Sequence, residues 1–194
     1  MNFSISFAIR KIHDGLYTVK YSGSSQPELT NLFEKWNDPE YLSDFFEANE
    51  ADLHSEFWHT ALGQPLTIDK AIDDTIQQAE QLEKCFYKQE HESYESFNTR
   101  LNQSFVSLLK SEVYKPLYQS LNKAYKSKKG WLRIYALRID TTYIVTGGAI
   151  KLTGKMEDRP HTQQQLDNLR NVAQLLKQNY FDSDTDFDSV YIEI

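Results

Sequence analysis

Apolar residues recur with two different periods along this sequence, and the order of these periods restricts the folds it can adopt. Near the start, apolar residues occupy every second position, as in a half-buried β-strand: Phe3, Ile5, Phe7 and Ile9. Asp14-Gly15 then predicts a hairpin turn, and the aromatic and β-branched residues of 16–21 predict the returning strand.

A long region with helical spacing follows the hairpin. Helices are predicted after Pro27, after Asp38-Pro39, over 67–88, over 97–108 and, more briefly, after Pro116. The helix over 67–88 is the clearest, because apolar residues recur every three or four positions along it. Cys85 lies near its apolar stripe and is expected to be a small core residue rather than a nucleophile.

Strand patterns return near residue 131. The segment 131–139 (WLRIYALRI) predicts one strand and 143–152 a second, and Gly147-Gly148 within the second suggests a bulge or a close backbone approach. A helix over 162–178 would begin with a capping box formed by Thr162 and Gln165. The last five residues could add an edge strand.

These patterns together predict an α+β fold in a single domain over 1–194. A small antiparallel sheet would combine the N-terminal hairpin with the C-terminal strands, and would pack with a helical insertion and a C-terminal helix. The sub-regions are a hairpin (1–22), an acidic helical region (27–126), a basic sheet and helix (131–180) and an acidic tail (181–194).

Charge is distributed unevenly along the chain. Residues 1–107 contain 8 Lys and Arg against 18 Asp and Glu, whereas residues 108–179 contain 13 against 5. This segregation suggests an anion-binding face in an otherwise acidic molecule, although acidic and basic parts that pack against each other would give the same counts.

Several functional classes lack their sequence signatures. The chain contains no phosphate-binding glycine loop and no nucleophile elbow. His54 and His59 are five residues apart, which does not fit the helical metalloprotease spacing, so no metal site and no cofactor are expected. With no long apolar segment, no leader pattern and one cysteine, the sequence predicts a cytoplasmic protein without a membrane partner.

The basic stretch from Trp131 to Thr162 contains side chains suited to cleaving an RNA backbone. The candidate catalytic residues are Arg133, Lys151, Lys155, Arg159 and His161. Arginine and lysine can stabilise the charge of a pentacovalent phosphorane, and histidine can transfer protons near neutral pH. The candidate RNA-binding residues are Trp131 and Tyr135, which could stack on a base, and Lys126, Lys128 and Lys129. Alternatively, these are ordinary surface residues, and His161 only shapes a turn.

The order of motifs in this half of the chain resembles a known family. Arg133-Ile134-Tyr135, a turn, the segment 143–153 (YIVTGGAIKLT) and a final helix resemble the carboxy-terminal half of RelE/HigB-like toxins. The resemblance implies a metal-independent endoribonuclease of a toxin–antitoxin or phage-defence system. Its partners would be RNA or the ribosome and a cognate antitoxin, and homo-oligomers are left open.

A second functional class fits the same charge distribution. The chain could be a non-enzymatic interaction or regulatory module, antitoxin-like or immunity-like, that binds a basic protein partner through its acidic helices. In the ribonuclease interpretation, the same helices could instead cover the basic face as a built-in inhibitor. Growth arrest on expression would favour the ribonuclease, and a stable basic partner would favour the binding module.

Overall fold

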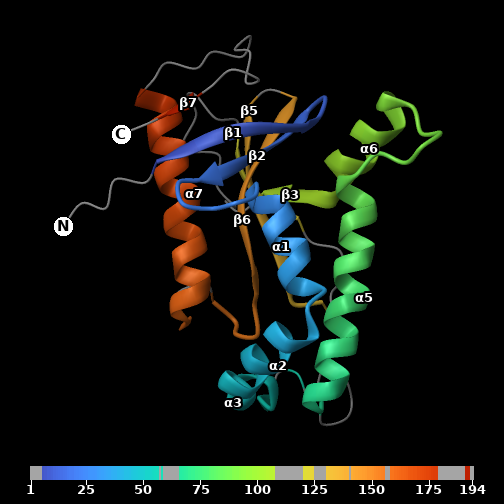
Figure 1. Cartoon of the computed structure of the whole chain (residues 1–194), viewed down its shortest axis with the longest axis vertical. Helices are drawn as coiled ribbons and strands as arrows, with labels where there is room; N and C mark the ends of the chain where they lie inside the picture. Colours follow the sequence, from blue (N-terminus) through green and yellow to red (C-terminus); the bar gives the residue numbers. More distant parts are fainter. Residues whose placement is uncertain are drawn as a thin grey trace.

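A seven-stranded sheet between two helical layers forms the framework of the molecule (Figure 1). The structure, a computed structural model, describes residues 6–56, 58, 66–107, 120–124, 130–139, 141–155, 158–178 and 191–192. Helix α7 (Pro160–Gln178) covers one face of the sheet. Helices α1 (Glu28–Trp36), α2 (Pro39–Ala48) and α5 (Ile68–Phe86) pack on the other. The predicted α+β class is therefore confirmed.

The sheet joins strands from both ends of the chain. Its strands are β1 (Phe7–His13), β2 (Leu16–Tyr21), β3 (Phe105–Ser107), β4 (Ser120–Ala124), β5 (Leu132–Ile139), β6 (Thr142–Ile150) and β7 (Tyr191–Ile192). They lie in the order β3-β4-β5-β6-β2-β1-β7. The predicted hairpin is present, with Gly15 at a φ of +80° in its turn, and β7 pairs with β1 as the predicted edge strand.

One pairing differs from the predicted antiparallel sheet. Strands β2 and β6 run parallel, with Leu16 opposite Tyr143 and Thr18 opposite Val145. Parallel neighbours need a long crossover, and the helical region between the two strands supplies it. The paired strands β1–β2, β3–β4, β4–β5 and β5–β6 are antiparallel, as expected.

Side-chain caps fix the starts of α2 and α5. The Asp38 carboxylate accepts hydrogen bonds from the backbone N–H groups of Glu40 and Tyr41 at the start of α2, and Pro39 occupies the first turn. The Thr67 hydroxyl accepts from Lys70 N–H at the start of α5. Short helix α3 (Glu50–Leu53) follows α2 directly.

Three local predictions are corrected by the structure. Helix α6 (Tyr94–Ser104) ends before Phe105, which begins β3 and stacks on Tyr143. Residues 120–124, predicted to be helical, form β4, because pairing with β5 outweighs their local helical spacing. Helix α7 starts at Pro160 rather than at a Thr162 cap, and the Thr162 hydroxyl donates to the Arg159 carbonyl instead.

Alternation along β5 divides the core between the two faces. Ile134 and Ala136 pack with the helices α1, α2 and α5, whereas Tyr135 and Leu137 pack against α7. Cys85 is buried in the first of these clusters, as predicted. The start of α7 lies beside α2 and α3 at one end of the molecule (Figure 1).

Candidate functional site

In the basic loop after β6, a lysine ammonium group donates hydrogen bonds to backbone carbonyls of the same loop. The Lys151 ammonium donates hydrogen bonds to the carbonyls of Thr153 (2.8 Å) and Gly154 (2.6 Å). The Lys155 side chain is exposed, and its backbone N–H donates to the Asp158 carboxylate. The two predicted catalytic lysines thus flank one turn, and the Lys151 side chain is hydrogen-bonded to it.

Arg159 forms a bidentate ion pair with Asp52 of α3. Its Nε donates to Asp52 Oδ2 at 2.6 Å, its second terminal nitrogen contacts Asp52 Oδ1, and its first donates to the Asp158 carbonyl. The Asp52 hydrogen bond and charge raise the pKa of Arg159 above its ordinary value. The predicted phosphate-binding cation is therefore neutralised by a carboxylate of the acidic helices.

His161 is held at the start of α7 by two contacts. Its Nε2 lies 3.0 Å from the Ile150 carbonyl oxygen, and because a carbonyl only accepts, this nitrogen carries the hydrogen. The Phe45 ring packs edge-on against the imidazole, with 5.3 Å between centroids. Proton transfer by His161 would therefore fall to Nδ1.

The two aromatic residues predicted to stack on RNA are core residues. Trp131 is 1% exposed, and its indole N–H donates to the Thr75 hydroxyl at 2.9 Å. Tyr135 is 0% exposed, and burial raises the pKa of its hydroxyl. The structure corrects this prediction, because neither ring offers a face to a base.

The remaining predicted residues divide between the sheet edge and undescribed positions. The Arg133 guanidinium, half-buried on β5, donates to the carbonyls of Gly130 and Leu132. The predicted RNA-binding residues Lys126, Lys128 and Lys129 lie outside the described residues.

A cavity of about 320 Å³ lies beside His161, between α1, α2, β6 and the first turns of α7. Its polar lining includes Glu28, Lys35, His161 and Gln165, and its apolar lining includes Trp36, Tyr41 and Phe45. Part of its wall is the backbone of 148–150. Polar and apolar groups contribute equally to its walls, so the cavity could hold a ligand that has both polar and apolar parts.

The glycine pair of β6 makes this cavity wall possible. A Cβ on Gly148 would lie 2.7 Å from the Arg133 carbonyl oxygen, 2.8 Å from Leu32 Cδ1 and 2.9 Å from Trp36 Cη2. A Cβ on Gly147 would lie 2.0 Å from Gln165 Oε1. The predicted close backbone approach is confirmed, and the register of β5 and β6 shifts opposite it, between Tyr135 and Ala136.

Two acceptor groups of the cavity are only partly satisfied. The Gln165 Oε1 atom is buried and has no hydrogen-bond partner within the described part of the chain. Burial raises the pKa of Glu28, while the charge of Lys35 and a hydrogen bond from Asn31 act in the opposite direction with less effect. Glu28 Oε1 lies 3.9 Å from the Cβ position of Gly147, the same point that Gln165 Oε1 approaches. Both oxygens therefore lie near the backbone of Gly147.

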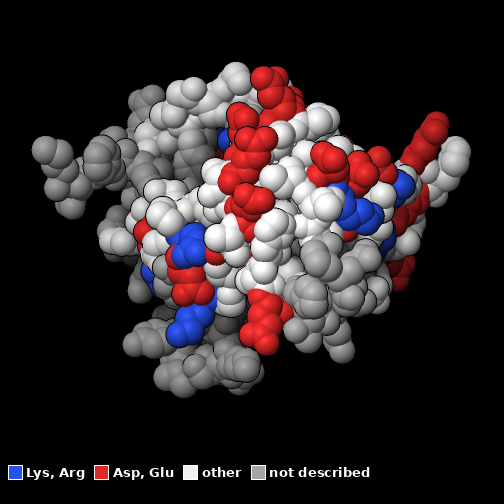
Figure 2. Space-filling view, turned by 90° about the horizontal axis from the view of Figure 1, so that it is seen from below, with Lys and Arg blue, Asp and Glu red and all other residues white. Residues whose placement is uncertain are grey.

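The outer surface of α1, α2 and α3 is acidic. Residues 28–56 contain nine Asp and Glu and one Lys. We use the term acidic surface for the exposed carboxylates of these helices: Glu34, Asp38, Glu40, Asp44, Glu47 and Glu50. Figure 2 shows the molecule from the end where α2 and α3 lie, and a band of Asp and Glu side chains crosses that face.

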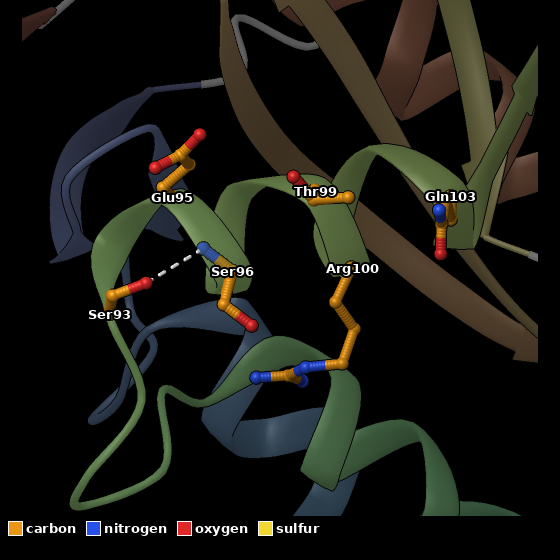
Figure 3. A pocket seen from close by; sticks show the side chains of 6 residues that line it. All are labelled: Ser93, Glu95, Ser96, Thr99, Arg100 and Gln103. Carbon is orange, nitrogen blue, oxygen red and sulfur yellow. Dashed lines mark hydrogen bonds between the residues drawn. The ribbon is translucent and has the colours of Figure 1, made fainter.

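A second hollow, of about 450 Å³, runs along α6. Its lining residues belong to this helix or to its N-cap, Ser93, so among the described residues no second element encloses a ligand there. Figure 3 shows the Arg100 side chain extending from α6 towards α5, away from Glu95. The guanidinium binds Glu92, the carbonyl of Lys84 in the last turn of α5, and the carbonyl of Tyr87 just after this helix. Arg100 is thus committed to the fold.

In the described part of the chain, no group of three or more His, Cys, Asp or Glu could hold a metal ion. His54 Nε2 lies 3.0 Å from the Leu66 carbonyl oxygen, and His59 falls outside the described residues. Among the helices that the structure describes, none is both long and apolar enough to cross a bilayer.

Sequence reasoning missed the acceptors of the cavity. The spacing between Thr162 and Gln165 predicts that Gln165 caps a helix, and Glu28 is expected to be a solvated carboxylate on a helix surface. The signal that could have located them is Gly147-Gly148, since paired glycines in a strand mark the place where other groups come close to the backbone. Comparison of the chain with protein-family models, curated proteins and solved structures finds no match.

Proposed function

We propose that this protein is a non-enzymatic interaction module that binds a basic protein partner through its acidic surface. The observation that carries the proposal is the exposure of six carboxylates on α1 to α3, a region whose one basic residue is Lys35. Such a surface attracts a basic segment and repels nucleic acid, whose backbone is anionic.

The contacts of the predicted catalytic residues favour this choice over the ribonuclease. A centre for RNA cleavage needs cations that can meet a phosphorane, and Arg159 is paired with Asp52 while Lys151 is bound to two carbonyls. Because the Trp131 and Tyr135 rings are buried, neither is available to stack on an RNA base as predicted. The ribonuclease remains a prediction with its own test below.

The proposal is tested with a fluorescent oligo-lysine peptide and two charge-matched variants. One variant neutralises the three carboxylates of α2 (Glu40→Gln, Asp44→Asn and Glu47→Gln), and the other neutralises three exposed carboxylates of α5 and α6 (Glu80→Gln, Glu83→Gln and Glu95→Gln). We expect fluorescence anisotropy to show binding at low salt that the α2 variant weakens about tenfold, because rim charges set encounter and affinity.

The control variant should bind the peptide almost as well as the wild type, since it has the same net charge. Raising the salt to roughly 0.3 M should weaken binding to the wild type, because screening shortens the reach of exposed charges. Equal loss in both variants would mean that net charge alone attracts the peptide and would refute a specific surface.

A further inference from the structure

The cavity beside the acidic surface combines three features that suit a ligand. It has an aromatic wall, a partly buried carboxyl and a buried amide oxygen that has no partner among the described residues. The two oxygens favour a hydrogen-bond donor, and the carboxylate and the aromatic rings favour a positively charged one.

We infer that this cavity receives an arginine side chain of the basic partner, with Glu28 and Gln165 as acceptors and Tyr41 and Phe45 as the stacking wall. The inference rests on the proposed function and names the anchor residue of the partner. It also adds a site within the acidic surface, because α1 and α2 supply both the cavity walls and the exposed carboxylates.

The shape of a guanidinium suits this arrangement better than an ammonium group. Guanidinium is planar, presents five N–H donors and stacks on aromatic rings, whereas ammonium is a compact, strongly hydrated point charge. The Tyr41 and Phe45 rings are stacked on each other, with 6.4 Å between centroids and an interplanar angle of 27°. Glu28 and Gln165 both line the cavity, and with five N–H donors one guanidinium can bind the oxygen of each.

Lys35 borders the same cavity and opposes the incoming charge. It is exposed on α1, and its charge already acts on Glu28. An arriving arginine therefore competes with Lys35 for the Glu28 carboxylate, so Lys35→Gln should strengthen arginine binding and Glu28→Gln should weaken it. Opposite effects of two neighbouring substitutions on one helix are the signature of this site.

The experiment is calorimetric titration of the full chain with N-acetyl-arginine amide, its neutral isostere N-acetyl-citrulline amide and N-acetyl-lysine amide. We expect saturable binding of the arginine probe, no binding of the citrulline probe and weaker binding of the lysine probe. Glu28→Gln should weaken the arginine probe about tenfold, which corresponds to losing one charge-assisted hydrogen bond. Glu40→Gln, an exposed carboxylate on α2, is the matched control and should change little.

Tyr41→Leu removes part of the aromatic wall and leaves Glu28 in place, so it tests the site independently of the carboxylate. Thermal unfolding of each variant checks that it is folded. The inference is overturned if the arginine probe does not saturate, if citrulline binds equally, or if folded Glu28→Gln and Tyr41→Leu bind arginine like the wild type. A lysine probe that binds as tightly as arginine overturns the choice of guanidinium.

A parallel titration with an oligo-arginine peptide separates this inference from the proposed function. If Glu28→Gln leaves peptide affinity unchanged while the α2 variant weakens it, the cavity is not the anchor and the acidic surface stands. If the arginine probe binds in the cavity but the α2 variant binds the peptide as tightly as the wild type, the arginine site is supported and the proposed basic partner is refuted.

Discussion

Arg159 and Asp52 are separated by 107 residues in the chain and form a bidentate ion pair that fastens the start of α7 to α3. The Asp52 side chain is 12% exposed and the Arg159 side chain 42% exposed, so the carboxylate is the more enclosed partner. The pair joins the basic loop to the acidic helices and fixes the end of α7 that lines the cavity.

We predict that this ion pair contributes to stability through coupling between its two partners. Asp52→Ala and Arg159→Ala should each lower the free energy of unfolding, and the double variant should lose less than the sum of the two. Urea denaturation of the four proteins in a double-mutant cycle measures this coupling. Strictly additive losses would show that the two side chains do not stabilise each other.

The same pair allows a direct test of the ribonuclease and of a built-in inhibitor. Asp52→Asn keeps the shape of the side chain but removes the charge that neutralises Arg159. We expect single-stranded RNA to stay intact with both the wild type and Asp52→Asn. The matched control adds Arg159→Ala to Asp52→Asn. If Asp52→Asn cleaved RNA and the added Arg159→Ala abolished the cleavage, the protein would be a ribonuclease that α3 inhibits.

Gly148 should tolerate no side chain. Gly148→Ala places a methyl group within 3 Å of a backbone oxygen and of the Leu32 and Trp36 side chains, so we expect a loss of about 1–3 kcal/mol from overpacking. Gly154→Ala is the control, since no atom of the residues that the structure describes lies within 4 Å of its Cβ position. Chemical denaturation compares the two, and equal stability of both variants would contradict the close approach at β6.

Glu28 should destabilise the folded protein at neutral pH. Burial raises the pKa of its carboxyl, so the native state holds the proton more tightly than the unfolded state and stability falls as pH rises through the native pKa. Tyr21, Lys35, Tyr41 and His161 are the other titratable groups that face it or share its cavity. Glu28→Gln should therefore be more stable than the wild type at neutral pH.

The stabilities of Glu28→Gln and wild type should converge below the ordinary carboxyl pKa, where both side chains are neutral. Glu34→Gln, an exposed position on the same helix, controls for the change in net charge. Urea titrations across the acidic pH range measure the difference. A variant less stable than wild type at neutral pH would show that the Glu28 charge supports the fold rather than a ligand.

Local signals predicted the elements whose pattern and packing agree. The Asp14-Gly15 turn, the Asp38 cap and the long helix α5 are all found as predicted, because side-chain caps and apolar spacing act within a few residues. Residues 120–124 have a helical pattern but pair with β5, and this partner lies too far along the chain for local reasoning to anticipate.

The candidate site could be predicted only in part, for a related reason. His161 and Gly147-Gly148 are distinctive in sequence, and both border the cavity or shape it. The roles of Glu28 and Gln165 depend on the packing of α1 and α7 around β6, which no single segment encodes. Trp131 is the opposite case: its residue type is suited to stacking on RNA, but its side chain is buried in the core.

Chemical-shift mapping by NMR on the full chain tests the binding account most directly. Our account predicts that an oligo-arginine peptide perturbs the backbone amides of α1 and α2, Gly148 and the Trp36 indole N–H, and that single-stranded RNA perturbs none of them. It would be contradicted if the peptide left these resonances unchanged while RNA shifted those of 151–161.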